Sequence, residues 1–114
     1  MRNVTVAAIQ MSIPETPEKS VEKAEKLVRK AAAEGANVIL LPELFENWYF
    51  CQERRYDSYK LALPLEENPA VRRFQTVAKE LSVVLPISFY EQDGNVLYNS
   101  VAMIDADGSV RGVY

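Results

Sequence analysis

The chain has 114 residues, of which 48% are hydrophobic and 25% charged, and its net charge is −3. These values are typical of one soluble globular domain and give no basic patch for nucleic acid. The apolar runs are far shorter than the roughly 20 residues of a membrane helix, so we expect no membrane partner. With one cysteine and no histidine, we expect no disulfide and no metal site. The N-terminus shows no secretory signal pattern, which fits a reducing cytoplasm.

The first half of the chain predicts a strand, a helix and a second strand. A run of apolar and β-branched residues predicts a buried strand over Val4–Met11, and a second over Asn37–Leu41. Between them, Thr16 and Pro17 are typical of a helix N-cap and first turn, and Gly35 is typical of a left-handed helix end. The apolar stripe of this helix comprises Val21, Ala24, Leu27, Val28, Ala31 and Ala32. This order predicts a βαβ unit with parallel strands.

The middle of the chain predicts a long loop followed by a second helix. Residues 45–60 show no regular period and are rich in aromatic side chains, and long loops of this kind are often functional. Asn68 and Pro69 again match a helix N-cap and first turn. The apolar stripe of the second helix comprises Val71, Phe74, Val77, Ala78 and Leu81.

The last third of the chain predicts antiparallel strands. Strands are expected over Val83–Tyr90, Val96–Ile104 and Val110–Tyr114, with turns at Glu91–Asn95 and Asp107–Gly108. The pairing therefore changes from parallel to antiparallel along the chain. Because the sequence stops inside an apparent strand without a polar tail, we interpret the chain as a piece of a longer protein.

Glu43 is the strongest candidate for chemistry. Pro42 has no N–H to donate, so strand pairing is expected to end near it and leave Glu43 at the carboxyl end of a buried strand. Ligands of α/β sheets bind at that end. A carboxylate among apolar neighbours can have a raised pKa and act as a general base. By position alone, the commoner alternative is a solvated loop carboxylate.

Other reactive residues give weaker signals. Cys51 lacks a histidine to activate it, which favours a small semi-buried apolar residue over a nucleophile. Glu46 lies close to Glu43, and two carboxylates can divide acid and base roles as in glycoside hydrolysis. The Arg54–Arg55 pair is expected to be solvated. The glycines show no phosphate-binding pattern.

Several motifs carry a resemblance to a known family. Val6–Met11, Ala32–Ala36 and Leu40–Phe45 resemble the first blocks of the nitrilase superfamily of carbon–nitrogen hydrolases, and Tyr98–Asp105 resembles the next recurring block. The similarity spans essentially the whole chain. Within the superfamily, the sequences Glu-Leu-Phe-Glu and Tyr-Phe-Cys-Gln, at 43–46 and 49–52, are most similar to N-carbamoylputrescine amidases.

The resemblance implies an α/β fold and an activity. The fold would be a nitrilase-like α-β-β-α sandwich, of which residues 1–114 form only the N-terminal half: a mixed sheet with two helices on one face. The activity would be hydrolysis of a non-peptide C–N bond through a thioester, by a Glu-Lys-Cys triad without metal or cofactor. Glu43 matches the triad glutamate, Tyr49 is a candidate substrate contact, and the lysine and the nucleophilic cysteine would follow Tyr114.

The resemblance also implies partners and leaves an alternative open. The substrate would be N-carbamoylputrescine or a similar small N-carbamoyl amine or amide, and the protein would form a homo-oligomer. With only the triad glutamate present, this chain alone is expected to be inactive. The alternative is a non-catalytic α/β association module, since half of a two-sheet sandwich leaves an apolar sheet face bare. That alternative predicts oligomers and no dependence on Glu43.

Overall fold

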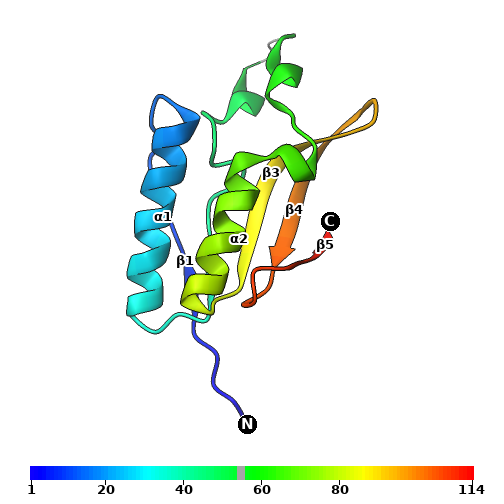
Figure 1. Ribbon diagram of the computed structural model, residues 1–114. Coiled ribbons are helices and arrows are strands. Elements are labelled where there is room, and N and C mark those ends of the chain that lie inside the picture. Colours follow the sequence, from blue (N-terminus) through cyan, green and yellow to red (C-terminus); the bar gives the residue numbers. More distant parts are fainter. Residues whose placement is uncertain (54–55) are drawn as a thin grey trace.

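The computed structural model describes residues 1–53 and 56–114, so the predicted Arg54–Arg55 pair lies outside the described residues. Two helices, α1 (Pro17–Ala33) and α2 (Pro69–Leu81), lie side by side over one face of a layer of strands (Figure 1). Both helices begin where the sequence predicts. Thr16 Oγ1 accepts a hydrogen bond from the Lys19 N–H at 3.3 Å, and Asn68 Oδ1 accepts one from the Val71 N–H at 2.9 Å.

The predicted βαβ unit is confirmed. Strand β1 (Val6–Ala8) pairs in parallel with β2 (Val38–Leu40), and α1 connects them. Gly35 has a φ of 98° just after the helix, and its N–H donates to the Ala32 carbonyl at 3.0 Å. The left-handed end predicted for this helix is therefore confirmed.

The prediction of a long, buried first strand is wrong. Only residues 6–8 of the predicted Val4–Met11 strand form β1, and Val6 keeps 67% of its surface exposed. Leu40 of β2 is 47% exposed. Side chains alternate between the two faces of a strand, and the helices cover one face only. The other face of β1 and β2 is therefore open.

The second half forms an antiparallel meander of β3 (Leu85–Asp93), β4 (Val96–Ile104) and β5 (Val110–Val113), as predicted. The first hairpin turn is tighter than predicted, because β3 extends to Asp93. The meander joins the parallel pair through a bridge between Val38 and Val84. The Ile39 N–H donates to the Val84 carbonyl at 3.0 Å, so parallel and antiparallel parts form one mixed layer.

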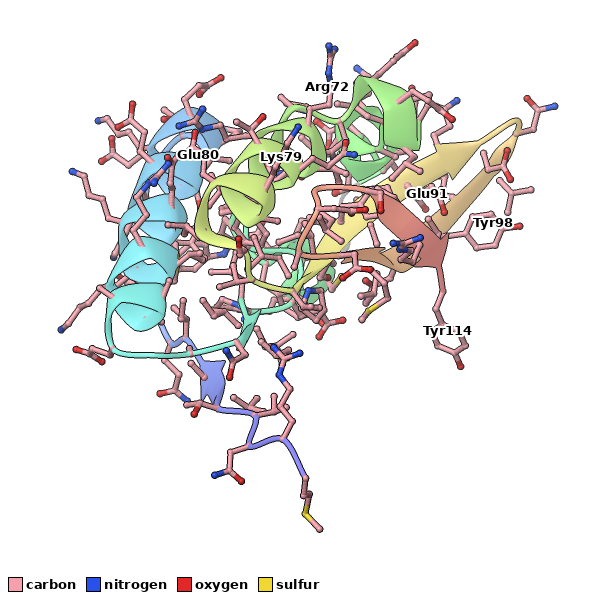
Figure 2. All side chains as sticks on the ribbon, turned by 60° about the horizontal axis from the view of Figure 1, so that its bottom comes forward. Arg72, Lys79, Glu80, Glu91, Tyr98 and Tyr114 are labelled. Carbon is pink, nitrogen blue, oxygen red and sulfur yellow. The ribbon has the colours of Figure 1, made fainter. Side chains whose placement is uncertain are left out.

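Between β2 and α2 the chain forms short 3-10 helices at Phe50–Gln52, Ser58–Leu61 and Leu65–Glu67. The core lies between the two helices and the covered face of the strands, where Phe45 and Phe74 pack edge to face with ring centroids 5.7 Å apart. The outer surface of α2 is polar, and Figure 2 shows Arg72, Lys79 and Glu80 along it. None of the described helices combines the length and apolarity that a membrane span requires.

Candidate functional site

Glu43 lies on the open face of the strand layer. It follows β2, and its Oε1 accepts a hydrogen bond from Asn99 Nδ2 at 2.5 Å. On β4, the flanking residue Ser100 and then Ala102 point into the covered core, so Asn99 belongs to the opposite face. The Glu43 carboxylate is exposed there.

Tyr49 lies close to Glu43, and Cys51 lies close to Tyr49. The pKa of the Tyr49 hydroxyl is raised, mainly by the negative charge of Glu43 and then by Cys51, whose side chain hydrogen-bonds Tyr49. The Cys51 thiol is exposed, which contradicts the prediction that it is semi-buried. The structure therefore brings together a carboxylate, a phenol and a thiol at the loop that follows β2.

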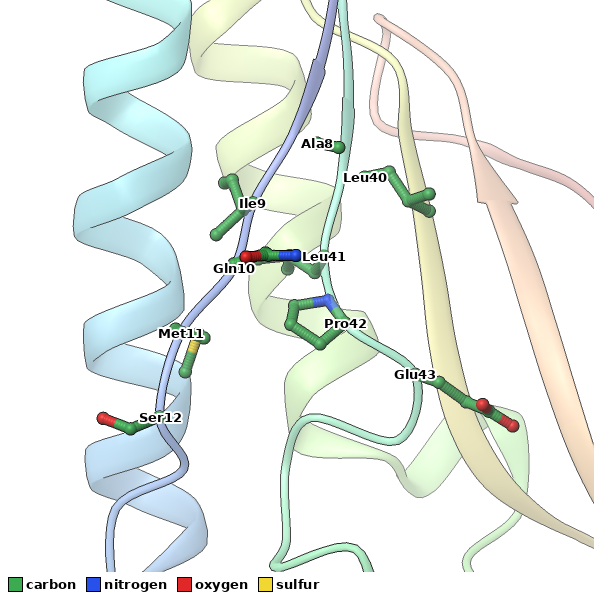
Figure 3. A pocket seen from close by; sticks show the side chains of 9 residues that line it. All are labelled: Ala8, Ile9, Gln10, Met11, Ser12, Leu40, Leu41, Pro42 and Glu43. Atoms are coloured by element: carbon green, nitrogen blue, oxygen red, sulfur yellow. The ribbon is translucent and has the colours of Figure 1, made fainter.

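An open groove adjoins this group of side chains. It runs along the carboxyl ends of β1 and β2, and Figure 3 shows Glu43 at one end of it, with its carboxylate directed toward the meander. The groove is lined by Ala8, Ile9, Gln10, Met11, Ser12, Leu40, Leu41, Pro42 and Glu43. Its position agrees with the general rule for ligand binding in α/β sheets.

The turn after Glu43 is fixed at three successive residues. The Leu44 N–H donates to Ser88 Oγ at 2.9 Å, and Leu44 has a φ of 49°, an uncommon conformation for leucine. Ser20 Oγ donates to the Phe45 carbonyl. Asn68 Nδ2 donates to Glu46 Oε1 at 2.9 Å. Glu43 is therefore attached to a turn whose backbone is held by α1 and β3, and whose Glu46 side chain is held at the start of α2.

Glu46 does not share a site with Glu43. Its carboxylate binds Asn68 at the start of α2, whereas Glu43 binds Asn99 on β4. Burial raises the pKa of Glu46, and the hydrogen bond from Asn68 partly opposes that rise. Because the two carboxylates have separate partners and environments, the paired arrangement that glycoside hydrolysis needs is not formed.

Sequence reasoning missed the hydrogen-bonding residues around Glu43. Asn99 lies in a motif that suggested the family, but its contact with Glu43 depends on the register of β3 and β4. Ser20 and Ser88 look like ordinary polar residues of a helix and a strand. In the structure both are buried, with Ser20 0% and Ser88 8% exposed, but no pattern in the sequence marks them. The described residues contain no group of three or more potential metal ligands.

Comparison with known proteins identifies the family. The carbon–nitrogen hydrolase family model matches residues 5–114. The chain belongs to the carbon–nitrogen hydrolase family of the nitrilase superfamily. It is 50% identical over 111 residues to an N-carbamoylputrescine amidase of Oryza sativa subsp. japonica, covering 97% of this chain and 37% of that protein. It is 43% identical to a citrullinase of Francisella tularensis, covering 100% of this chain and 40% of that protein.

Solved structures confirm the fold predicted for this hydrolase chain. A carbon–nitrogen hydrolase from Helicobacter pylori G27 superposes with a TM-score of 0.88 at 25% identity, covering 97% of this chain and 38% of that one. Nit3 of Saccharomyces cerevisiae superposes with a TM-score of 0.80 at 19% identity, covering 97% and 43%. The chain thus spans about two-fifths of the length of the relatives it matches, and it represents part of the nitrilase fold.

Proposed function

We propose that residues 1–114 form the N-terminal part of an amidase that hydrolyses N-carbamoylputrescine or a similar N-carbamoyl amine. Relatives named N-carbamoylputrescine amidase and citrullinase support the substrate class. Both N-carbamoylputrescine and citrulline, the compounds in these names, carry a terminal carbamoyl group on nitrogen. The observation that carries the proposal is the placement of Glu43 at the carboxyl end of β2, hydrogen-bonded to Asn99 and beside Tyr49. We also propose that the protein works in the cytoplasm, which its single cysteine fits.

Glu43 would act as the general base of a Glu-Lys-Cys triad. It would take the proton of a cysteine thiol while the sulfur bonds to the substrate carbonyl carbon, and the amine would leave with a proton. Glu43, having passed the thiol proton to that amine, would then take a proton from the water that hydrolyses the acyl–sulfur bond and return it to the cysteine sulfur. The carbamate released would break down to ammonia and carbon dioxide. A lysine would stabilise the negative charge on the carbonyl oxygen. No metal or cofactor enters this scheme.

In this proposal, the lysine and the nucleophilic cysteine of the triad lie outside residues 1–114. Cys51 is the only cysteine, and we do not assign it as the nucleophile. A general base alone contributes about 10²–10⁴-fold to a rate, so we expect the 114-residue chain to be inactive by itself. Tyr49 would contact the substrate beside Glu43.

A chimera tests this proposal. Residues 1–114 replace the matching segment of the rice N-carbamoylputrescine amidase, and ammonia release from N-carbamoylputrescine is measured. We expect turnover in the chimera, none in the 114-residue chain, and a loss of at least about 10³-fold in the Glu43→Gln chimera. A folded chimera without turnover would overturn the substrate. Full activity in the Glu43→Gln chimera would overturn the role of Glu43.

A second candidate function is association with another copy of the chain. The open sheet face favours it, because Val6, Leu40 and Met103 are exposed apolar side chains on that face. Sedimentation of the 114-residue chain at micromolar concentration tests it. A stable oligomer that Glu43→Gln leaves unchanged, together with an inactive chimera, would favour association over catalysis. We also propose that the complete amidase is a homo-oligomer.

A further inference from the structure

Buried polar side chains gather around one short turn. In the described parts of the chain, four polar residues are buried: Ser20, Asn68, Ser88 and Ser100. The first three bind Phe45, Glu46 and Leu44, the residues that follow Glu43. Burying a hydroxyl or an amide is unfavourable unless it is hydrogen-bonded. Three such buried groups, from three separate elements, therefore all form hydrogen bonds to the same turn.

Of these three hydrogen bonds, the one to Ser88 reaches the residue next to Glu43, because its donor is the Leu44 N–H. The backbone ladder between β2 and β3 does not extend this far, because β2 ends at Leu40 and Pro42 has no N–H to donate. Beyond the proline, the Ser88 hydroxyl accepts the N–H of Leu44. A side chain of β3 thus continues the attachment that the backbone can no longer make.

Ser20 holds the same turn from the helix side. Its hydroxyl, fully buried on α1, donates to the Phe45 carbonyl. Between these two attachments the backbone passes through Leu44, whose φ is 49°. A non-glycine residue keeps such a conformation only where its surroundings determine it. Ser88 binds the Leu44 N–H on one side of the Leu44–Phe45 peptide, and Ser20 binds the Phe45 carbonyl on the other. These two hydrogen bonds hold Leu44 in this conformation.

We propose that Ser88, assisted by Ser20, is a positioning residue that holds Glu43 over the open face against Asn99. This inference rests on the proposed function, in which Glu43 is the general base. Ser88 touches no reacting atom and acts through the backbone of Leu44. A displacement of about 1 Å can cost about 100-fold in rate, so the attachment bears directly on the rate of the chemical step.

The first arm of the test does not depend on activity. In the 114-residue chain, NMR measures amide hydrogen exchange and the side-chain amide shifts of Asn99. Ser88→Ala should speed exchange at Leu44 by about 10-fold or more and move the Asn99 shifts toward those of Glu43→Gln. Exchange at Ile39, whose N–H is bonded to the Val84 carbonyl, should not change. Unchanged Leu44 exchange and unchanged Asn99 shifts would overturn the proposal.

The second arm measures the reaction in the rice chimera. Ser88→Ala should lower kcat by about 10- to 100-fold and leave KM within about twofold. Ser88→Thr keeps a hydroxyl and should retain kcat within about threefold. Ser100→Ala is the matched control, because Ser100 is also buried and donates to Glu91 Oε1, away from the turn. If Ser88→Ala does not fold, Ser88→Cys preserves the volume with a poorer acceptor.

The outcomes separate the two proposals. If Ser100→Ala lowers kcat as much as Ser88→Ala, or if Ser88→Thr gives no rescue, the positioning role is wrong while the amidase proposal stands. If the Glu43→Gln chimera is fully active, Glu43 is not the general base and the positioning role of Ser88 is wrong with it, whereas the amidase activity stands. If Glu43→Gln abolishes turnover and only the Ser88 variants without a hydroxyl lower kcat, both stand.

Discussion

The two faces of the strand layer differ in what covers them. On the face beneath α1 and α2, the side chains of β3 and β4 that lie next to the helices are completely buried, as Ile87 and Ile104 illustrate. On the opposite face Met103 is 40% exposed, and Glu43 and Asn99 meet in the open. Stability therefore comes mainly from the helix-covered face, whereas the candidate chemistry lies on the open face. Substitutions on the two faces should affect different measurements.

The largest expected effect is on the covered face. Phe74→Ala removes a fully buried ring that packs against Phe45, and such truncations cost about 3–5 kcal/mol of unfolding free energy. Met103→Ala on the open face should cost less than about 1 kcal/mol, because Met103 is already 40% exposed to water. Urea unfolding measures both variants. Equal losses of unfolding free energy in the two variants would show that the open face is covered in solution, and the contrast between the two faces would then be wrong.

A second test concerns the turn before β5. Gly108 has a φ of 86°, and a Cβ there would lie 2.7 Å from the Gln75 carbonyl oxygen of α2. Gly108→Ala should therefore cost about 2 kcal/mol or more. Gly112→Ala on β5, where a Cβ meets nothing within 4 Å, should change stability by less than about 0.5 kcal/mol. Thermal unfolding distinguishes them, and a stable Gly108→Ala variant would contradict the close packing of this turn against α2.

Substitution of Asn68 should have a smaller effect on stability, for two reasons. Its side chain caps α2 and also donates to Glu46. Asn68→Ala should lower the unfolding free energy by about 1–2 kcal/mol, whereas Asn68→Asp keeps the cap but loses the donor. If denaturant unfolding shows that the aspartate variant matches wild type at neutral pH, the contact with Glu46 contributes nothing.

The smallest expected effect is a change of folding stability with pH that is due to Glu46. Burial raises its folded pKa above the ordinary value of 4.5, so its contribution to stability is complete below pH 4.5 and is lost as the pH rises through the folded pKa. Glu46→Gln should therefore be more stable than wild type at pH 7, with the difference vanishing toward pH 4. Urea midpoints across this range measure it, and a constant difference would contradict the assignment.

Glu25 provides a control of opposite sign. A hydrogen bond from Arg73 is the main cause that lowers the pKa of Glu25. Its contribution to stability is therefore present above the ordinary glutamate pKa and is lost as the pH falls through the lowered folded value. Glu25→Gln should be less stable than wild type at pH 7 and approach it in acid.

The sequence could predict those features that depend on residues close together in the chain. The caps at Thr16 and Asn68 act within one helical turn, so both helices were predictable at their first residues. Glu43 could be placed because a short motif positions it at the end of a strand. Its contact with Asn99 joins distant parts of the chain and requires the register of the meander. The exposure of β1 could not be predicted, because a local apolar pattern does not tell which face is covered.

The short parallel pair also has a kinetic consequence. The two residues Gly94 and Asn95 join β3 to β4, so the first residue pair of this hairpin forms when a short loop closes. Pairing of Val6 with Val38 closes a much longer loop, because the whole of α1 lies between them in the chain. Non-local contacts form slowly because the entropy of a long loop is lost before they stabilise the chain. We expect pulse-labelling to protect the amides of the hairpin before those of β1, so that the edge beside Glu43 is the last part of the sheet to assemble.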